Sequence, residues 1–201
     1  CDFHTLSELM IGFKIAIKLF SDSKSELNKP YVCIGTQSTA QAKYWNYPGG
    51  WDNVVKYLKK KNYDVVCIDQ HRYFGNGNFM NSSPEDVIHR HDRTLDQTIA
   101  TMNGCEFFIG LGSGLSWLAW ALEKPVVLIS GFSRPFSEFS IDCERVFNPD
   151  VCNGCYNDSQ LDPSNWKWCP IHEDTDRMFE CTKTITPSVV KESINNIIEK
   201  L

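Results

Sequence analysis

The fold is decided by residues 105–131, which read CEFFIGLGSGLSWLAWALEKPVVLISG. A short apolar run at 107–109 leads into a turn with three glycines, a helix-length apolar segment follows at 115–122, and a second apolar run occupies 126–129. Both runs are too continuous for strands with one exposed face. We therefore expect a parallel sheet covered on both sides, with a buried helix between these two strands.

The turn between the first strand and the helix is a candidate anion site. The N–H groups of a helix's first turn have no partner within the helix and lie at the positive end of its dipole. Here the hydroxyls of Ser113 and Ser116 flank them. We expect a phosphate or diphosphate as the ligand. The alternative is a tight turn in an α/β core without a ligand, because Gly-x-Gly alone is a weak signal.

The chain from residue 30 onward alternates between predicted strands and helices. Further strands are expected at 31–34 and 63–68, and further helices at 51–60 and at 94–102, the latter with Leu95, Ile99 and Met102 on one face. We expect no regular element at 70–83, which is rich in Asn and Gly. Four strands with intervening helices predict a doubly wound, Rossmann-like parallel sheet, whose ligands bind at the carboxyl ends of the strands.

Polar side chains follow three of these strands and are expected to line one crevice. They are Thr36, Gln37, Ser38 and Thr39 after the first strand, Asp69 and Gln70 after the second, and Ser113 with Gly114 after the third. Lys43 comes just after the first of these loops. Its ammonium group could meet a phosphate held at the Ser113–Gly114 helix end, because a lysine acts as a movable point charge. The alternative is a solvated surface lysine.

Composition restricts the class of protein. At 201 residues the chain can bury one core plus an appendage, or two small domains. A net charge of -5 gives no support to nucleic-acid binding, and no apolar run approaches the roughly 20 residues needed to span a membrane. Because the chain begins at Cys1 without an initiator methionine, we expect a trimmed or processed protein whose function depends on a missing partner segment.

Four of the nine cysteines form a cluster, Cys-x2-Cys-x13-Cys-x11-Cys, and the other predicted-core cysteines are scattered. The cluster consists of Cys152, Cys155, Cys169 and Cys181. Four thiolates at this spacing suit tetrahedral zinc or a rubredoxin-like single iron. The alternatives are two disulfides or free thiols. An odd cysteine count argues against a fully paired disulfide framework, so we expect a cytoplasmic protein with a metal site.

The ends of the chain are predicted to be helical. Residues 3–20 form an amphipathic pattern that we expect to pack on a neighbouring domain or subunit, and Pro187 begins a final helix that runs to Leu201. The expected division is an N-terminal helix and linker at 1–29, a Rossmann-like ligand-binding domain at 30–140, a cysteine-rich metal-binding segment at 141–185, and a C-terminal helix at 186–201.

Taken together, these motifs resemble glycosyltransferase family 9. Residues 36–45, followed by 51–55, are similar to the start of the donor domain in its ADP-heptose transferases, and 113–122 is similar to their second signature. The cysteine set is similar to the iron-binding cysteines of bacterial autotransporter heptosyltransferases, which modify serines of surface adhesins. Gly112 and Trp117 depart from the wider family, which has aspartate and histidine there, so side-chain contacts of those two residues do not transfer.

The resemblance implies a fold and a function. It implies the carboxyl-terminal half of a GT-B glycosyltransferase that transfers heptose from ADP-heptose to serine hydroxyls of autotransporter adhesins. It implies donor-binding residues, namely Thr36, Gln37 and Ser38 at the phosphates, Lys43 as the catalytic group that neutralises them, and Ser113, Gly114 and Leu115 around the diphosphate. Base and ribose contacts are expected from Asp69 and from Asp92 and Arg93, by position alone.

The remaining expectations concern partners and alternatives. The general base would lie in an amino-terminal acceptor-binding domain, so this chain alone would bind donor and transfer little. We expect a homo-oligomer. One alternative is a metal-stabilised interaction module, in which the cysteine region and terminal helices assemble subunits. Another is a GT-B half that uses a different nucleotide sugar.

Overall fold

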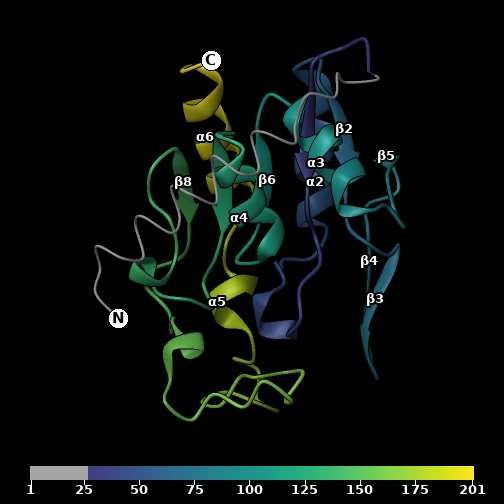
Figure 1. The fold of residues 1–201 in the computed structure, drawn as a ribbon. Coiled ribbons are helices and arrows are strands. Elements are labelled where there is room, and N and C mark those ends of the chain that lie inside the picture. The colour runs from purple at the N-terminus through teal and green to yellow at the C-terminus, as the bar shows by residue number, and fades with distance from the viewer. Residues whose placement is uncertain (1–26) are drawn as a thin grey trace, which may run out of the picture.

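A computed structural model describes residues 27–201, so the helix predicted at 3–20 lies outside the described residues. One parallel sheet forms the centre of the molecule, with the strand order β5-β2-β1-β6-β7-β8 (Figure 1). Its strands are β1 Tyr31–Ile34, β2 Asp64–Cys67, β5 Ile88–His89, β6 Phe108–Leu111, β7 Val126–Ile129 and β8 Cys143–Val146. The doubly wound parallel sheet is confirmed, but the prediction of four strands omitted β5 and β8.

Helices cover both faces of this sheet. Val32 and Ile34 of β1 pack on one face against α2 (Gly50–Lys60) and α6 (Pro187–Ile198). Tyr31 and Cys33 point to the opposite face, where α3 (Leu95–Asn103) and α4 (Gly114–Ala121) pack. Because successive residues of a strand point to opposite faces, a strand that is covered on both faces needs an uninterrupted apolar run. Each such side chain stabilises the fold by about 1.5–3 kcal/mol when fully buried.

The helix starts follow capping rules. Thr94 caps α3 with a reciprocal capping box, in which its hydroxyl accepts from the Gln97 N–H and the Gln97 side chain accepts from the Thr94 N–H. Pro187 is the first residue of α6, as predicted, because its fixed φ suits this position and its missing N–H would have no helical partner. The helix ends at Ile198, three residues before the predicted end.

The prediction that 70–83 contains no regular element was wrong. Strands β3 (Tyr73–Asn76) and β4 (Phe79–Ser82) pair antiparallel there as a separate two-stranded sheet. Gly77 and Asn78 form the connection, and Gly77 has φ 56°. A two-residue hairpin loop needs positive φ, which glycine adopts without steric cost. The residues that suggested a loop are therefore those of a hairpin turn.

The cysteine-rich segment packs against the carboxyl end of the sheet and carries a third small core. Phe132, Trp168, Cys169 and Phe179 surround Ala42 there. After β8, its regular structure consists of the 3-10 turn η3 (Cys155–Asn157) and the short helix α5 (Glu180–Lys183). In Figure 1 the segment forms the green and yellow-green loops below the sheet. No helix formed by residues 27–201 is long and apolar enough to cross a bilayer.

The strand order places a crevice next to the predicted polar loops. The chain proceeds from β1 to β2 in one direction and from β6 to β7 in the other, so the order reverses between β1 and β6. Loops diverge at such a switch point and leave room for a ligand at the carboxyl ends of the strands. The loop after β1 and the glycine turn after β6 both leave the sheet at this point.

Candidate functional site

Lys43 and Ser113 line the same cavity, although 69 residues separate them in the sequence. This cavity has a volume of about 850 Å³ and lies at the switch point. Most of the predicted donor-binding residues are on its wall, namely Gln37, Ser38, Lys43, Asp69, Ser113, Gly114 and Leu115. The structure thus brings together residues that follow β1, β2 and β6.

The amino end of α4 forms one wall of the cavity. Ser113 is the N-cap residue with extended backbone, and its hydroxyl makes no hydrogen bond among the described residues. The N–H groups of Gly114 and Leu115 follow at the first two helical positions, where no partner exists within the helix. Ser116, by contrast, does not flank the anion site as expected. Its side chain is buried, and its hydroxyl donates to the Leu111 carbonyl at 2.5 Å.

Thr36 lies behind the cavity wall because Asp69 binds it. The Thr36 hydroxyl donates to Asp69 Oδ2 at 2.6 Å, and its N–H donates to Oδ1 at 2.9 Å. The Gln37 N–H donates to the same Oδ1 at 3.1 Å. Burial raises the pKa of Asp69, while these hydrogen bonds favour its ionised form. Asp69 therefore fixes the loop after β1, and Ser38 and Thr39 reach the cavity from that loop.

Two of the three residues expected to contact the base and ribose do not line the cavity. Asp92 and Arg93 are not among the residues that line the cavity, and Asp92 lies beside His71, with Oδ1 3.8 Å from Nδ1. The cavity instead has apolar walls. Leu115 was predicted at the site, whereas Phe74 of the β3–β4 hairpin, Leu95, Ile99 and Leu118 were not. Leu95 was expected on a buried helix face, but it is 65% exposed because it faces this cavity.

Lys43 is held at the cavity by the cysteine-rich segment. It ends the 3-10 turn η1 (Gln41–Lys43), where the Gln41 N–H donates to the Trp166 carbonyl at 2.7 Å and the Ala42 N–H donates to the Lys167 carbonyl at 3.2 Å. Its ammonium nitrogen lies 5.3 Å from the centre of the Tyr156 ring. Burial lowers the pKa of Lys43, and the negative charge of Glu138 opposes this shift.

A second, smaller cavity meets the first at Lys43 and the start of α4. Its volume is about 180 Å³, and its wall is mainly polar. The residues shared with the large cavity are Lys43, Ser113, Gly114 and Trp117, and the others are Gly112, Ser133, Ser137, Glu138 and Tyr156. An apolar cavity and a polar cavity thus adjoin one group of anion-binding atoms. Sequence reasoning did not identify Glu138, because it lies on the loop after β7, outside every motif.

The four predicted metal ligands lie near one another as free thiols. Burial raises the pKa of Cys181 to about 12, and the charges of Cys152, Cys155 and Cys169 add to the rise. Burial also raises the pKa of Cys155, with a further contribution from Cys169. Mutually repelling thiolates in a buried cluster need a cation to be stable in the ionised form. Gly154, with φ 85°, supplies the left-handed turn between Cys152 and Cys155. Among residues 27–201, however, the group of His, Cys, Asp and Glu side chains whose ligand atoms all lie within 4.8 Å of one another includes Cys152 and none of the other three cysteines.

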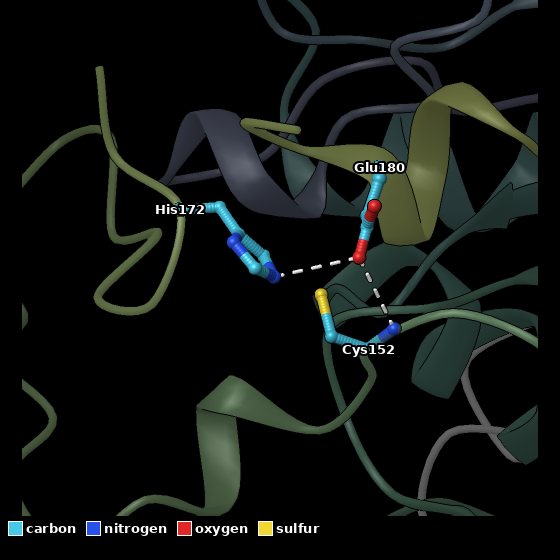
Figure 2. A group of neighbouring side chains, drawn as sticks. All are labelled: Cys152, His172 and Glu180. Atoms are coloured by element: carbon cyan, nitrogen blue, oxygen red, sulfur yellow. Dashed lines mark hydrogen bonds and ion pairs between the residues drawn. The ribbon is translucent and has the colours of Figure 1, made fainter. Parts of the chain in front are cut away.

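Two further donors adjoin Cys152, and the sequence did not reveal them. Figure 2 shows His172 and Glu180 directed toward Cys152, and the three ligand atoms all lie within 4.8 Å of one another. His172 Nε2 is 3.4 Å from Glu180 Oε1, which also accepts from the Cys152 N–H at 3.4 Å. Burial raises the pKa of Cys152 to about 12, and the neighbouring Glu180 carboxylate adds to the rise. Two donor sets that share Cys152 are thus available.

A profile of glycosyltransferase family 9 (heptosyltransferase) matches residues 6–137. The chain belongs to glycosyltransferase family 9. The autotransporter heptosyltransferase Aah of Escherichia coli is 48% identical over 174 residues, which cover 84% of this chain and 44% of Aah. The family 9 resemblance and the similarity to autotransporter heptosyltransferases are confirmed.

A solved structure supports the fold assignment. The heptosyltransferase TibC from enterotoxigenic E. coli matches with a TM-score of 0.85 and 45% identity, over 89% of this chain and 48% of TibC. That structure is described as dodecameric and iron-containing, in complex with ADP-D-beta-D-heptose. The sheet and its helices are thus those of a GT-B type heptosyltransferase.

A third relative shows that similarity to autotransporter heptosyltransferases does not by itself imply activity. BimC of Burkholderia thailandensis is 36% identical over 185 residues, which cover 90% of this chain and 43% of BimC, and it is named an inactive autotransporter heptosyltransferase. The chain spans about half the length of the curated relatives it matches. Activity, substrates and partners of the whole protein therefore need their own argument.

Proposed function

We propose that this chain is the donor-binding half of a glycosyltransferase that transfers heptose from ADP-heptose to serine hydroxyls of autotransporter adhesins. One observation carries the proposal: an apolar cavity and a polar cavity meet at Lys43 and the amino end of α4. A nucleotide sugar has the same three-part chemistry, with an apolar base, a central diphosphate and a polar sugar. The donor named for TibC, ADP-D-beta-D-heptose, is a ligand of this kind.

The three parts of the donor match different residues. The base would enter the large cavity, where Phe74, Leu95 and Ile99 offer apolar surface. The diphosphate would lie between the Lys43 ammonium and the N–H groups of Gly114 and Leu115, because both carry positive charge. The sugar would then extend into the polar cavity. The expected roles of Gln37 and Ser38 at the phosphates fit this placement, whereas that of Thr36 would be indirect, through Asp69.

The chemistry assigned to this half is departure of the leaving group. In the transfer, the bond from the anomeric carbon to the diphosphate breaks, a bond to the acceptor oxygen forms, and the hydroxyl proton passes to a general base. Lys43 and the α4 N–H groups would stabilise the charge that grows on the departing diphosphate. This makes Lys43 the catalytic residue of this half. The general base would belong to an amino-terminal acceptor-binding domain.

We also propose that Cys152, Cys155, Cys169 and Cys181 hold iron or zinc. Their Cys-x2-Cys-x13-Cys-x11-Cys spacing supports this set, and the iron reported for TibC favours iron. When bound, the metal would supply a cross-link within the segment that contacts η1 through the carbonyls of Trp166 and Lys167 and contacts Lys43 through Tyr156. The chain's own residues then hold Lys43 at the donor site. This integration argues against an interaction module whose crevice is vestigial.

The proposed setting is cytoplasmic and oligomeric. A charged nucleotide sugar does not cross membranes unaided, so the donor would be found inside the cell. Free thiols also persist in a reducing compartment. The dodecamer reported for TibC supports a homo-oligomer. The protein partners would be the amino-terminal domain and the adhesin.

Calorimetric titration with ADP, ADP-heptose and other nucleotide sugars tests the proposal. We expect the full-length protein to bind ADP and ADP-heptose, and Lys43→Met to weaken both about tenfold to a hundredfold, because a hydrogen-bonded charge is lost. Lys56→Met is the matched control, since Lys56 is exposed on α2. Transfer of heptose to an adhesin peptide is measured directly, because one relative is named inactive. Failure to bind ADP would refute the donor site.

A further inference from the structure

The polar cavity contains a carboxylate that the proposed mechanism does not use. Glu138 follows the 3-10 turn η2 (Pro135–Ser137), and its side chain is only 7% exposed. It lines the same small cavity as the anion-binding residues Lys43, Ser113 and Gly114. A buried carboxylate next to a diphosphate site would weaken phosphate binding, because like charges repel. Its presence therefore calls for a ligand group other than phosphate.

The carboxylate is held in one position by three side chains. Ser133 Oγ donates to Glu138 Oε1 at 2.7 Å, and Ser130 Oγ donates to Oε2 at 3.2 Å. The guanidinium of Arg145 on β8 also donates to Oε2. Arg145 is fixed in turn by the Ser133 carbonyl at 2.6 Å and the Ser130 carbonyl at 3.2 Å. The group is thus preorganised, with its charge partly balanced by Arg145.

These hydrogen bonds leave acceptor capacity on the cavity side. An ionised carboxylate offers about four lone-pair sites and donates nothing. Arg145 and Ser130 use Oε2, whereas Oε1 has one short partner, Ser133. Oε1 is therefore the oxygen that can accept from a ligand in the cavity. The suitable donors are hydroxyl groups.

Gly112 shows that Oε1 lies directly at the turn after β6. A Cβ atom added to Gly112 would lie 2.4 Å from Glu138 Oε1, which is closer than real contacts allow. Any side chain at 112 would have to displace the carboxylate. The Glu138 carboxylate thus reaches the turn after β6 from the loop after β7, and the glycine at 112 makes room for it.

We propose that Glu138 is the specificity-determining residue for the sugar of the donor, with Oε1 accepting hydrogen bonds from its hydroxyl groups. This rests on the proposed function, because it needs the diphosphate to lie between Lys43 and α4. The site favours an uncharged, hydroxyl-rich sugar, since an acidic sugar would bring two carboxylates together. ADP lacks the transferred sugar and has no hydroxyl of that sugar to donate to Oε1, so Glu138 adds no favourable contact to the binding of ADP.

The test compares ADP with ADP-heptose in the full-length protein. Calorimetric titration of Glu138→Gln should show ADP-heptose bound about tenfold to a hundredfold more weakly, with ADP affinity equal to or higher than that of the wild type, because a negative charge near the diphosphate is removed. Gly112→Ala should likewise weaken ADP-heptose binding selectively, because its methyl group displaces the carboxylate. Glu199→Gln is the matched control, as Glu199 is exposed at the end of α6. Retained ADP affinity also shows that each variant is folded.

The outcomes separate the two proposals. If the wild-type protein binds neither ADP nor ADP-heptose, the donor site itself is refuted. If the wild type binds both and Glu138→Gln binds both equally well, or weakens both by the same factor, the sugar role of Glu138 is overturned. Glu138→Asp provides a second measurement should Glu138→Gln fail to fold. Glu138→Asp keeps the charge, but its shorter side chain moves the carboxylate back from the cavity. This variant should therefore also lose ADP-heptose affinity selectively.

Discussion

The ammonium nitrogen of Lys43 lies 5.3 Å from the centre of the Tyr156 ring, and Tyr156 directly follows Cys155. A residue of the donor site is thus supported by the cysteine-rich segment. Phe132 adds a second ring, whose centre is 6.0 Å from the same nitrogen. This arrangement connects two features that the sequence presented as independent, the anion site and the thiol cluster.

Replacing Tyr156 should weaken donor binding moderately. Tyr156→Leu removes one cation–π contact, and such contacts contribute about 0.5–1 kcal/mol at accessible sites, so we expect ADP affinity to fall about twofold to fivefold. Tyr156→Phe keeps the ring and serves as the control. Calorimetric titration with ADP measures both. Equal affinities for Tyr156→Leu and Tyr156→Phe would show that the ring does not support Lys43.

Loss of one thiol should remove the metal and loosen the donor site. We expect Cys169→Ser to lower metal content in elemental analysis and to reduce Tm by about 10 °C, because metal binding contributes to folding. ADP affinity should fall with it, since η1 hydrogen-bonds to residues 166 and 167. His172→Ala should retain the metal. The reverse result, with metal lost in His172→Ala and kept in Cys169→Ser, would assign the site to Cys152, His172 and Glu180.

The stability contributed by Asp69 should decrease as pH rises. Burial raises its pKa, so the folded protein keeps this proton to a higher pH than the unfolded chain, where an aspartate titrates near about 3.9. The contribution is fully present below that value and is lost as pH rises through the folded pKa. Asp69→Asn cannot titrate. The free energy of unfolding of wild type minus that of Asp69→Asn should therefore fall above about pH 4 and then level off.

Urea unfolding of both proteins over a series of pH values measures this difference. Hydrogen bonds from Thr36 and Gln37 favour the ionised carboxylate and act in the opposite direction. A difference that grows with pH would mean that these bonds outweigh burial.

The buried Glu138–Arg145 pair should show strong coupling in a double-mutant cycle. The two side chains are 7% and 14% exposed, so screening by water is limited. Arg145→Met leaves the Glu138 charge without its partner and should destabilise the fold by about 3–5 kcal/mol. Adding Glu138→Gln removes that charge. The double variant should therefore lose less free energy of unfolding than the sum of the losses in the two single variants. Purely additive losses in urea unfolding would contradict the pairing.

The sheet could be predicted because its signals are local. Uninterrupted apolar runs such as Val126–Ile129 mark strands covered on both faces, and the structure has these strands where expected. Strand β8 was missed because two of its four residues, Glu144 and Arg145, are charged, which is tolerated at the edge of a sheet. The β3–β4 hairpin was missed because the Gly77-Asn78 turn signal was interpreted only as loop composition.

The site could be predicted only where motifs mark it. Lys43 and Ser113 were found because they follow strands that end at one edge of the sheet. Glu138 and His172 lie on irregular loops, and no spacing rule connects them to their neighbours. The inward position of Thr36 likewise depends on Asp69, which reaches it from the next strand. Such contacts arise from tertiary packing, and a single sequence does not encode them in any local pattern.

The backbone bonds from Gln41 and Ala42 to Trp166 and Lys167 join distant parts of the chain. Contacts between residues so far apart form late in folding, because the entropy of closing a long loop must be overcome first. The parallel strands can assemble before that, with η1 still unattached. The donor lysine would therefore be set in place only after residues 166 and 167 have left the ribosome, later than every strand of the central sheet, so the sheet can form before the protein is able to bind substrate.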